Sequence, residues 1–67
     1  MNQAETFVQS CGLEGNVDIE DARLMATSWY AATIDGENGD LFAMFYDYSV
    51  ARWNNDVGTW TLEESSK

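Results

Sequence analysis

The chain has 67 residues, of which twelve are acidic and three are basic, so its formal net charge is −9. This length allows one domain, and this charge repels DNA, RNA and anionic membranes. The single cysteine excludes an internal disulfide, and the lack of histidine excludes the usual zinc ligand sets. Because 45% of the residues are hydrophobic and 13% are aromatic, we expect a folded domain with an aromatic core. A homodimer is one way for so short a chain to gain stability.

Apolar residues at helical spacing predict a first helix over residues 2–11. The residues that share one face of this helix are Ala4, Phe7, Val8 and Cys11. Gly12 fits a C-terminal cap, and residues 12–17 have the composition of a loop. Cys11 lies on the apolar face and has no activating neighbour in sequence, so we expect it to pack in the core.

A second helix is predicted from about residue 18 to residue 33. Asp18 is placed to cap its first turn, with Asp21 three residues later in an arrangement like a capping box. Glu20 and Asp21 add negative charge where the helix dipole favours it. The alternative is a shorter helix that ends near Ala26, followed by a strand over residues 27–34, because that stretch is rich in aromatic and β-branched residues.

The second half of the chain has strand and turn patterns. Residues 35–40 form a turn, residues 41–51 a strand, residues 54–56 a second turn and residues 57–63 a return strand. One face of the long strand is wholly apolar or aromatic and is expected to face the core; it consists of Phe42, Met44, Tyr46, Tyr48 and Val50. The other face turns polar halfway along and is expected to be partly wet; it consists of Leu41, Ala43, Phe45, Asp47 and Ser49.

These elements predict an α+β fold, in which two N-terminal helices pack on a C-terminal antiparallel β-hairpin or three-stranded sheet. The expected core consists of Trp29, Tyr30, Phe42, Met44, Tyr46, Trp60 and Leu62. Residues 64–67 are expected to fray. The longest apolar run has six residues, far fewer than the ~20 that span a bilayer, so no membrane association is expected. A lone cysteine fits a reducing cytoplasm.

The sequence lacks the residue patterns that catalysis and cofactor binding require. No histidine can serve as a base, and the only lysine is the last residue. The oxygen-rich turn at residues 35–40 fails the EF-hand pattern, because Asp40 and Tyr46 stand where glycine and glutamate are needed. Arg23 and Arg52 alone cannot neutralise a phosphate track. We therefore expect no enzyme activity, no cofactor, no metal and no direct binding of nucleic acid.

The placement of charge suggests a protein partner instead. The acidic residues are spread through helix starts and turns and are not gathered in one tail. On a helix, carboxylates three or four residues apart lie about 5–6 Å apart, which is of the order of phosphate separations along a nucleic acid. The residues expected to bind a basic partner are Asp18, Glu20, Asp21, Asp35, Glu37, Asp40, Asp47 and Asp56. Trp53 is expected to be an exposed anchor in this surface, with core packing as the alternative.

In size, charge and lack of catalytic residue types, the chain resembles the small acidic anti-defence proteins of phages and mobile elements. These include anti-CRISPR and anti-restriction proteins, some of which mimic DNA. The resemblance implies a non-enzymatic inhibitor that covers the DNA-binding surface of a host CRISPR effector complex; it assigns no role to any single residue. Two alternatives stay open: an adaptor or antitoxin-like module that binds through aromatic residues such as Tyr48, and a halophilic domain whose charge serves solubility.

Overall fold

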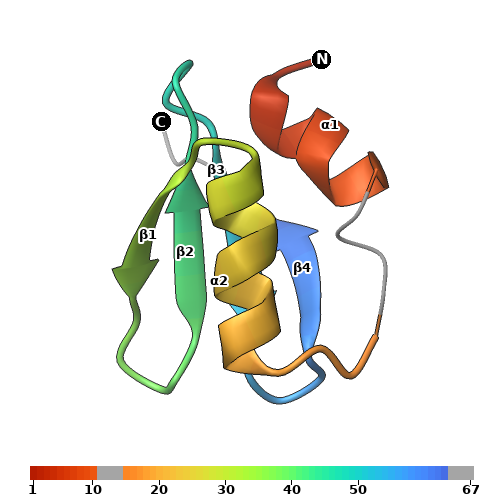
Figure 1. The fold of residues 1–67 in the computed structure, drawn as a ribbon, viewed down its shortest axis with the longest axis vertical. Helices are drawn as coiled ribbons and strands as arrows, with labels where there is room; N and C mark the ends of the chain where they lie inside the picture. Colours follow the sequence, from red (N-terminus) through yellow and green to blue (C-terminus); the bar gives the residue numbers. More distant parts are fainter. Residues whose placement is uncertain (11–14, 64–67) are drawn as a thin grey trace.

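A computed structural model describes residues 1–10 and 15–63 of the chain. The predicted packing of Cys11 and the cap at Gly12 lie outside the described residues. Two helices precede four strands (Figure 1). The elements are α1 (Gln3–Ser10), α2 (Ile19–Ser28), β1 (Ala32–Asp35), β2 (Leu41–Met44), β3 (Val50–Asn54) and β4 (Thr59–Leu62). The predicted α+β class is confirmed, although the sheet has four strands and not two or three.

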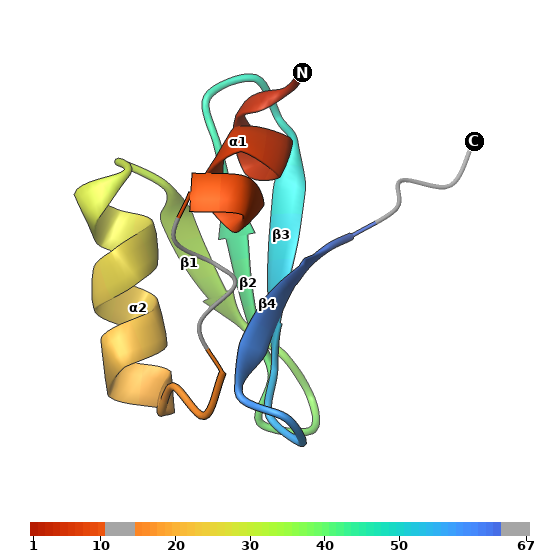
Figure 2. The same cartoon turned by 90° about the vertical axis from the view of Figure 1, so that its right-hand side faces the viewer.

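The sheet is an antiparallel meander in the order β1-β2-β3-β4. Each strand pairs with its neighbour in sequence, from Ala32 opposite Met44 in the first pair to Trp53 opposite Trp60 in the last. Both helices lie on the same side of the sheet (Figure 2), with α2 against β1 and β2 and α1 against β3 and β4. The molecule therefore has two layers, and the core lies between the helices and one sheet face.

Helix α2 begins as predicted, because the side chain of Asp18 accepts a hydrogen bond from the Asp21 N–H at 2.9 Å. It ends at Ser28, so the prediction of a helix to residue 33 is wrong and the shorter alternative is nearly right. Tyr30 adopts a φ of +62°, and the Tyr30 and Ala31 N–H groups bond to the carbonyls of Thr27 and Ala26. This is the Schellman pattern that closes a helix, here with a tyrosine where glycine is usual.

The predicted strand over residues 41–51 is two strands, and its buried face is the opposite of the one expected. Leu41, Ala43 and Phe45 are buried, whereas Tyr46 and Tyr48 are 80% and 82% exposed. Residues 46–49 form a turn closed by the Phe45 N–H on the Ser49 carbonyl. Asp47 and Ser49 are polar because they lie in a turn and not because one face of a strand is exposed to water. The prediction treated them as part of one alternating strand, and it therefore assigned the wrong face to the core.

The core is built around Phe7 of α1. Its ring centroid lies 5.5 Å from that of Trp29, 5.3 Å from that of Phe45 and 5.0 Å from that of Trp60. The buried apolar residues are Ala4, Phe7, Ala22, Ala26, Ala31, Leu41, Ala43, Phe45, Ala51, Trp53 and Trp60. Small residues face each other between α2 and the sheet, so the helix can approach closely. Of the predicted core, Trp60 is buried and Trp29 packs against the core. The prediction is wrong for Tyr30, Met44, Tyr46 and Leu62, which are exposed.

Candidate functional site: an acidic end of the molecule

Seven of the ten carboxylates in the described residues lie at one end of the molecule, which we call the acidic end. Three segments meet there: the start of α2, the end of β1 with the β1–β2 loop (residues 35–40) and the β3–β4 turn at residues 55–58 (lower edge of Figure 1). The carboxylates are Asp18, Glu20, Asp21, Asp35, Glu37, Asp40 and Asp56. Together with Arg23 and Arg52, they give this end a formal charge of −5. The acidic residues are therefore concentrated and not evenly spread.

The start of α2 is attached to the β3–β4 turn by backbone and indole hydrogen bonds. The Val17 N–H bonds to the Gly58 carbonyl at 3.0 Å, and the Trp53 Nε1–H donates to the Val17 carbonyl at 3.1 Å. Gly58 has a φ of +70°, and a Cβ there would lie 3.0–3.1 Å from backbone atoms of Asn16 and Val17. This close approach requires glycine.

Trp53 is not an exposed anchor, because only 3% of it is exposed. The expectation that Trp53 is exposed is therefore wrong, and the alternative of core packing is correct. Its side chain lies on the helix-covered face of β3, in register with Trp60 of β4. Its contribution to the acidic end is to hold the segment before α2 in place.

Asp40 joins the β1–β2 loop to the β3–β4 turn. One oxygen accepts the Asn55 N–H at 2.9 Å, and the other accepts Nε of Arg52 at 3.0 Å and a second guanidinium nitrogen. The Asn55 side chain also donates to the Asn38 carbonyl at 3.3 Å. The Asn55 backbone bond, followed by the Arg52 bond, holds the pKa of Asp40 below its ordinary value of 3.8. Asp40 is only 6% exposed, so it offers a partner little surface, and the bonds that the structure gives it are structural.

The carboxylates of Asp35 and Asp18 each accept a hydrogen bond that stabilises the fold, and both remain exposed to solvent. The Arg23 guanidinium lies 3.0 Å from an Asp35 oxygen and also donates to the Thr33 hydroxyl, which links α2 to β1. The Asp35 side chain nevertheless remains 71% exposed. Asp18 is exposed while it caps α2. Both carboxylates can therefore meet a cation from outside without loss of their internal bonds.

The remaining carboxylates of the acidic end are exposed, and no described residue donates a hydrogen bond to their side chains. They are Glu20, Asp21, Glu37 and Asp56. Beside them, a pocket lies between the start of α2 and the β3–β4 turn. It is lined by apolar side chains, including Val17, Ile19 and Val57, and by Asp18 and Asp56. An apolar lining next to carboxylates suits the long stem and charged head of lysine or arginine.

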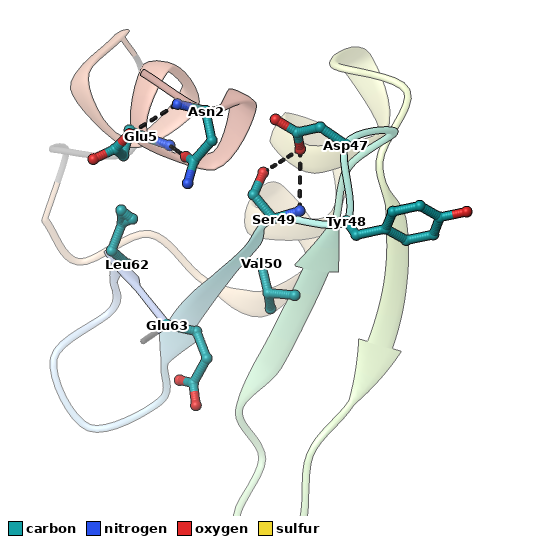
Figure 3. Close-up of a pocket in the computed structure, with 8 residues that line it drawn as sticks. All are labelled: Asn2, Glu5, Asp47, Tyr48, Ser49, Val50, Leu62 and Glu63. Carbon is teal, nitrogen blue, oxygen red and sulfur yellow. Dashed lines mark hydrogen bonds between the residues drawn. The ribbon is translucent and has the colours of Figure 1, made fainter. Parts of the chain in front are cut away.

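Asp47 lies at the other end of the sheet and does not join the predicted binding residues. It accepts a hydrogen bond from the Gln3 N–H at 2.8 Å. It also accepts hydrogen bonds from the N–H and the hydroxyl of Ser49, which Figure 3 shows as dashed lines. The Ser49 hydroxyl and then the Gln3 N–H lower the pKa of Asp47 from 3.8. The Ser49 Oγ in turn accepts the Ala4 N–H at 2.9 Å. Asp47 and Ser49 therefore satisfy the free N–H groups at the start of α1.

The sequence interpretation missed several residues that stabilise the acidic end and the opposite end of the sheet, where α1 begins. Asn2 and Glu5 exchange two 2.8 Å bonds at the start of α1 (Figure 3), and their spacing is that of a capping box, so this signal was present in the sequence. Asn55 was covered only by a general turn signal, and Gly58 was placed in the return strand predicted over residues 57–63, whereas β4 begins at Thr59 and Gly58 lies in the turn before it. Nothing in the sequence indicates that the Asn55 backbone meets Asp40, because that contact depends on how the two loops are arranged in space.

Comparisons with protein-family models, curated proteins and solved structures gave no match, so they assign no family or function to this chain. Within residues 1–10 and 15–63, no three Cys, His, Asp or Glu side chains are grouped so that they could hold a metal ion. In the same part of the chain, no helix is long and apolar enough to cross a membrane.

Proposed function

We propose that this chain is a non-enzymatic acidic inhibitor that binds a basic nucleic-acid-binding surface of a host defence complex, such as a CRISPR effector complex. In this proposal it acts in the cytoplasm and competes with DNA for that surface. The observation that carries the proposal is the gathering of seven carboxylates on three segments at one end of the molecule. Such a field attracts a cationic groove and speeds encounter with it.

The bonds between the three segments support this proposal because they fix the carboxylates before a partner arrives. The contacts through Val17, Asp40 and Arg23 join α2, the β1–β2 loop and the β3–β4 turn. A surface that is already ordered loses less conformational entropy on binding. A flexible acidic tail of the same charge would lack this advantage. The pocket beside Asp56 adds a place for one lysine or arginine of the partner.

The test removes charge from the acidic end without touching its frame. The variant Glu20→Gln/Glu37→Gln changes two exposed side chains that accept no hydrogen bond from the described residues. The matched control Glu5→Gln/Glu63→Gln removes the same charge elsewhere, and glutamine at residue 5 can keep the bond to Asn2. Competition against a labelled DNA duplex bound to a Cascade-type effector is measured by fluorescence anisotropy at 50 and 200 mM salt.

We expect the wild type to displace the duplex, more strongly at low salt. The acidic-end variant should need about tenfold more protein, while the control stays within about twofold of the wild type. Equal weakening by both variants would show that total charge matters and its location does not. Failure of the wild type to displace DNA from the effector at 50 mM salt would contradict the proposal.

Exposed tyrosines favour a second candidate function, an adaptor that binds a partner through aromatic side chains. Tyr30, Tyr46 and Tyr48 are 80%, 80% and 82% exposed at the end opposite the acidic end. Tyr30 and Tyr48 also have φ values of +62° and +67°, a conformation that is costly for bulky residues and is often retained for function. The variant Tyr46→Ser/Tyr48→Ser separates the candidates: it should leave DNA displacement unchanged if the acidic end is the binding surface, and abolish partner binding if the tyrosines are.

A further inference from the structure

The β1–β2 loop contains the dipeptide Asn38-Gly39, and both of its residues are exposed. Gly39 has a φ of +83°, and a Cβ there would lie 2.8 Å from the side-chain nitrogen of Asn55. The fold therefore requires glycine directly after Asn38. This pairing has a chemical consequence, because a residue without a side chain lets its backbone nitrogen approach the side-chain amide of the asparagine before it.

Asn38 is held in the loop by its backbone and not by its side chain. Its carbonyl accepts a hydrogen bond from the Asn55 side chain at 3.3 Å. Its side-chain amide forms no hydrogen bond with a described residue, so it can rotate towards the Gly39 nitrogen. The donor on the Asn38 carbonyl also polarises the peptide bond that follows, which makes the Gly39 N–H more acidic.

The backbone N–H that follows the asparagine distinguishes Asn38 from the other four asparagines of the chain. None of the residues that the structure describes accepts a hydrogen bond from the Gly39 N–H. The N–H groups that follow the other asparagines all donate: Gln3 to an Asp47 oxygen at 2.8 Å, Val17 to the Gly58 carbonyl at 3.0 Å, Asn55 to an Asp40 oxygen at 2.9 Å and Asp56 to an Asn54 oxygen at 2.9 Å. A bonded N–H is held in place and loses its proton less readily than a free one.

We propose that Asn38 is a site of spontaneous deamidation, which converts it to aspartate or isoaspartate in the folded protein. The Gly39 N–H gives its proton to hydroxide, the nitrogen forms a bond to Cγ of Asn38, and the Cγ–Nδ2 bond breaks. Nδ2 takes a proton from water and leaves as ammonia, so that a five-membered succinimide remains. Water then opens the ring: cleavage of the new bond at Cγ gives aspartate, and cleavage at the backbone carbonyl carbon gives isoaspartate. Water and hydroxide are the only co-reactants, and no atom is oxidised or reduced.

The modification changes the acidic end in two ways. Either product adds one carboxylate, so the formal charge of this end changes from −5 to −6. Aspartate preserves the backbone of the loop. Isoaspartate lengthens the backbone by one methylene and turns the carbonyl that accepts the Asn55 bond into a free carboxylate. The two products therefore differ in how they affect the contact between the β1–β2 loop and the β3–β4 turn.

Incubation of the full chain at pH 8 and 37 °C tests the proposal. Peptide mapping by mass spectrometry follows the mass increase of about 1 Da that deamidation causes at each asparagine. We expect Asn38 to be modified at least about tenfold faster than any other asparagine. Labelling with an isoaspartyl methyltransferase distinguishes isoaspartate from aspartate. These measurements need no partner, so their failure and the failure of the proposed function are separate results.

Two variants assign the charge that ion-exchange chromatography detects during the incubation. Asn38→Gln should remove most of the early gain of negative charge, because glutamine would have to close a six-membered ring. The matched control, Asn54→Gln in the neighbouring β3–β4 segment, should keep the rate within about twofold of the wild type, since the N–H after residue 54 is bonded to Asp40. Near-UV circular dichroism verifies that both variants are folded. Equal rates in the two variants would contradict the assignment to Asn38.

Amide hydrogen exchange, measured by NMR, gives a second readout that needs no variant. The Gly39 amide should be at least about tenfold less protected than the amides of Val17 and Asn55, which are hydrogen-bonded. A Gly39 amide that is as protected as the Asn55 amide would overturn the proposal. Deamidation that begins at another asparagine, or no mass increase at Asn38 after several weeks, would do so as well.

Discussion

The two ends of the sheet use their carboxylates differently. At the end near α1, Asp47 and Glu5 accept hydrogen bonds from backbone N–H groups and hold the helix in place. At the acidic end, most carboxylates are exposed and accept no hydrogen bond from the described residues. The role of a carboxylate in this protein therefore follows from the hydrogen bonds that it accepts. Asp40 is the instructive case, because it lies at the acidic end and yet is bonded as fully as Asp47.

The largest effect in this comparison is expected from Gly58→Ala at the acidic end. Alanine at a φ of +70° is strained, and its Cβ would meet backbone atoms of Asn16 and Val17 at 3.0–3.1 Å. We expect the free energy of unfolding to fall by about 2 kcal/mol, measured by urea denaturation at fixed protein concentration. Gly15→Ala is the matched control, because its Cβ would have an ordinary 3.7 Å contact with Thr59. Equal losses for the two variants would show that the Val17–Gly58 contact is not tight.

A smaller effect is expected at the other end from Asn2→Ala. This change removes the side-chain acceptor that serves the Glu5 N–H and should lower the free energy of unfolding by about 1 kcal/mol. Asn2→Asp restores a capping oxygen and should recover most of the loss in the same urea experiment. If Asn2→Asp is as unstable as Asn2→Ala, the capping box does not stabilise α1. Neither variant should change binding through the acidic end.

The smallest effect is expected on acidification and distinguishes the two bonded carboxylates. Asp40 and Asp47 both have a folded pKa below 3.8, so their bonds contribute stability above about pH 3.8, which is lost as the pH falls through the folded value. Urea denaturation between pH 5 and pH 2.5 should show this loss. Asp40→Asn and Asp47→Asn should each be less stable at pH 5 and flatten the pH dependence. The idea fails if both variants keep the wild-type slope.

Local signals in the sequence were sufficient for the start of α2 and for the turns that follow β1 and β3, but not for the turn at residues 46–49. The cap at Asp18 and the turns at residues 35–40 and 54–56 depend on residues close in sequence, so they could be predicted. The buried face of residues 41–45 could not be predicted from alternation, because both faces are apolar there. Only packing against the helices decides between Leu41 and Phe42, and that is a tertiary interaction.

The residues of the candidate site could be predicted from the sequence, but their arrangement in space could not. Glu20, Glu37 and Asp56 could be named from their charge, yet their meeting at one end depends on the strand order and on the direction of α2. The burial of Asp40 and the capping role of Asp47 depend on partners far along the chain, at Asn55 and Gln3. Separations of 15 and 44 residues leave no local pattern to read.

The separation of bonded from unbonded carboxylates has a consequence for how this protein can change over generations. Substitutions at Glu20, Asp21, Glu37 or Asp56 break no hydrogen bond among the described residues, so selection for stability constrains them little. The frame beneath them, with Gly58 and Asp40, tolerates far fewer replacements. The outer charges can therefore vary more freely than the scaffold that positions them.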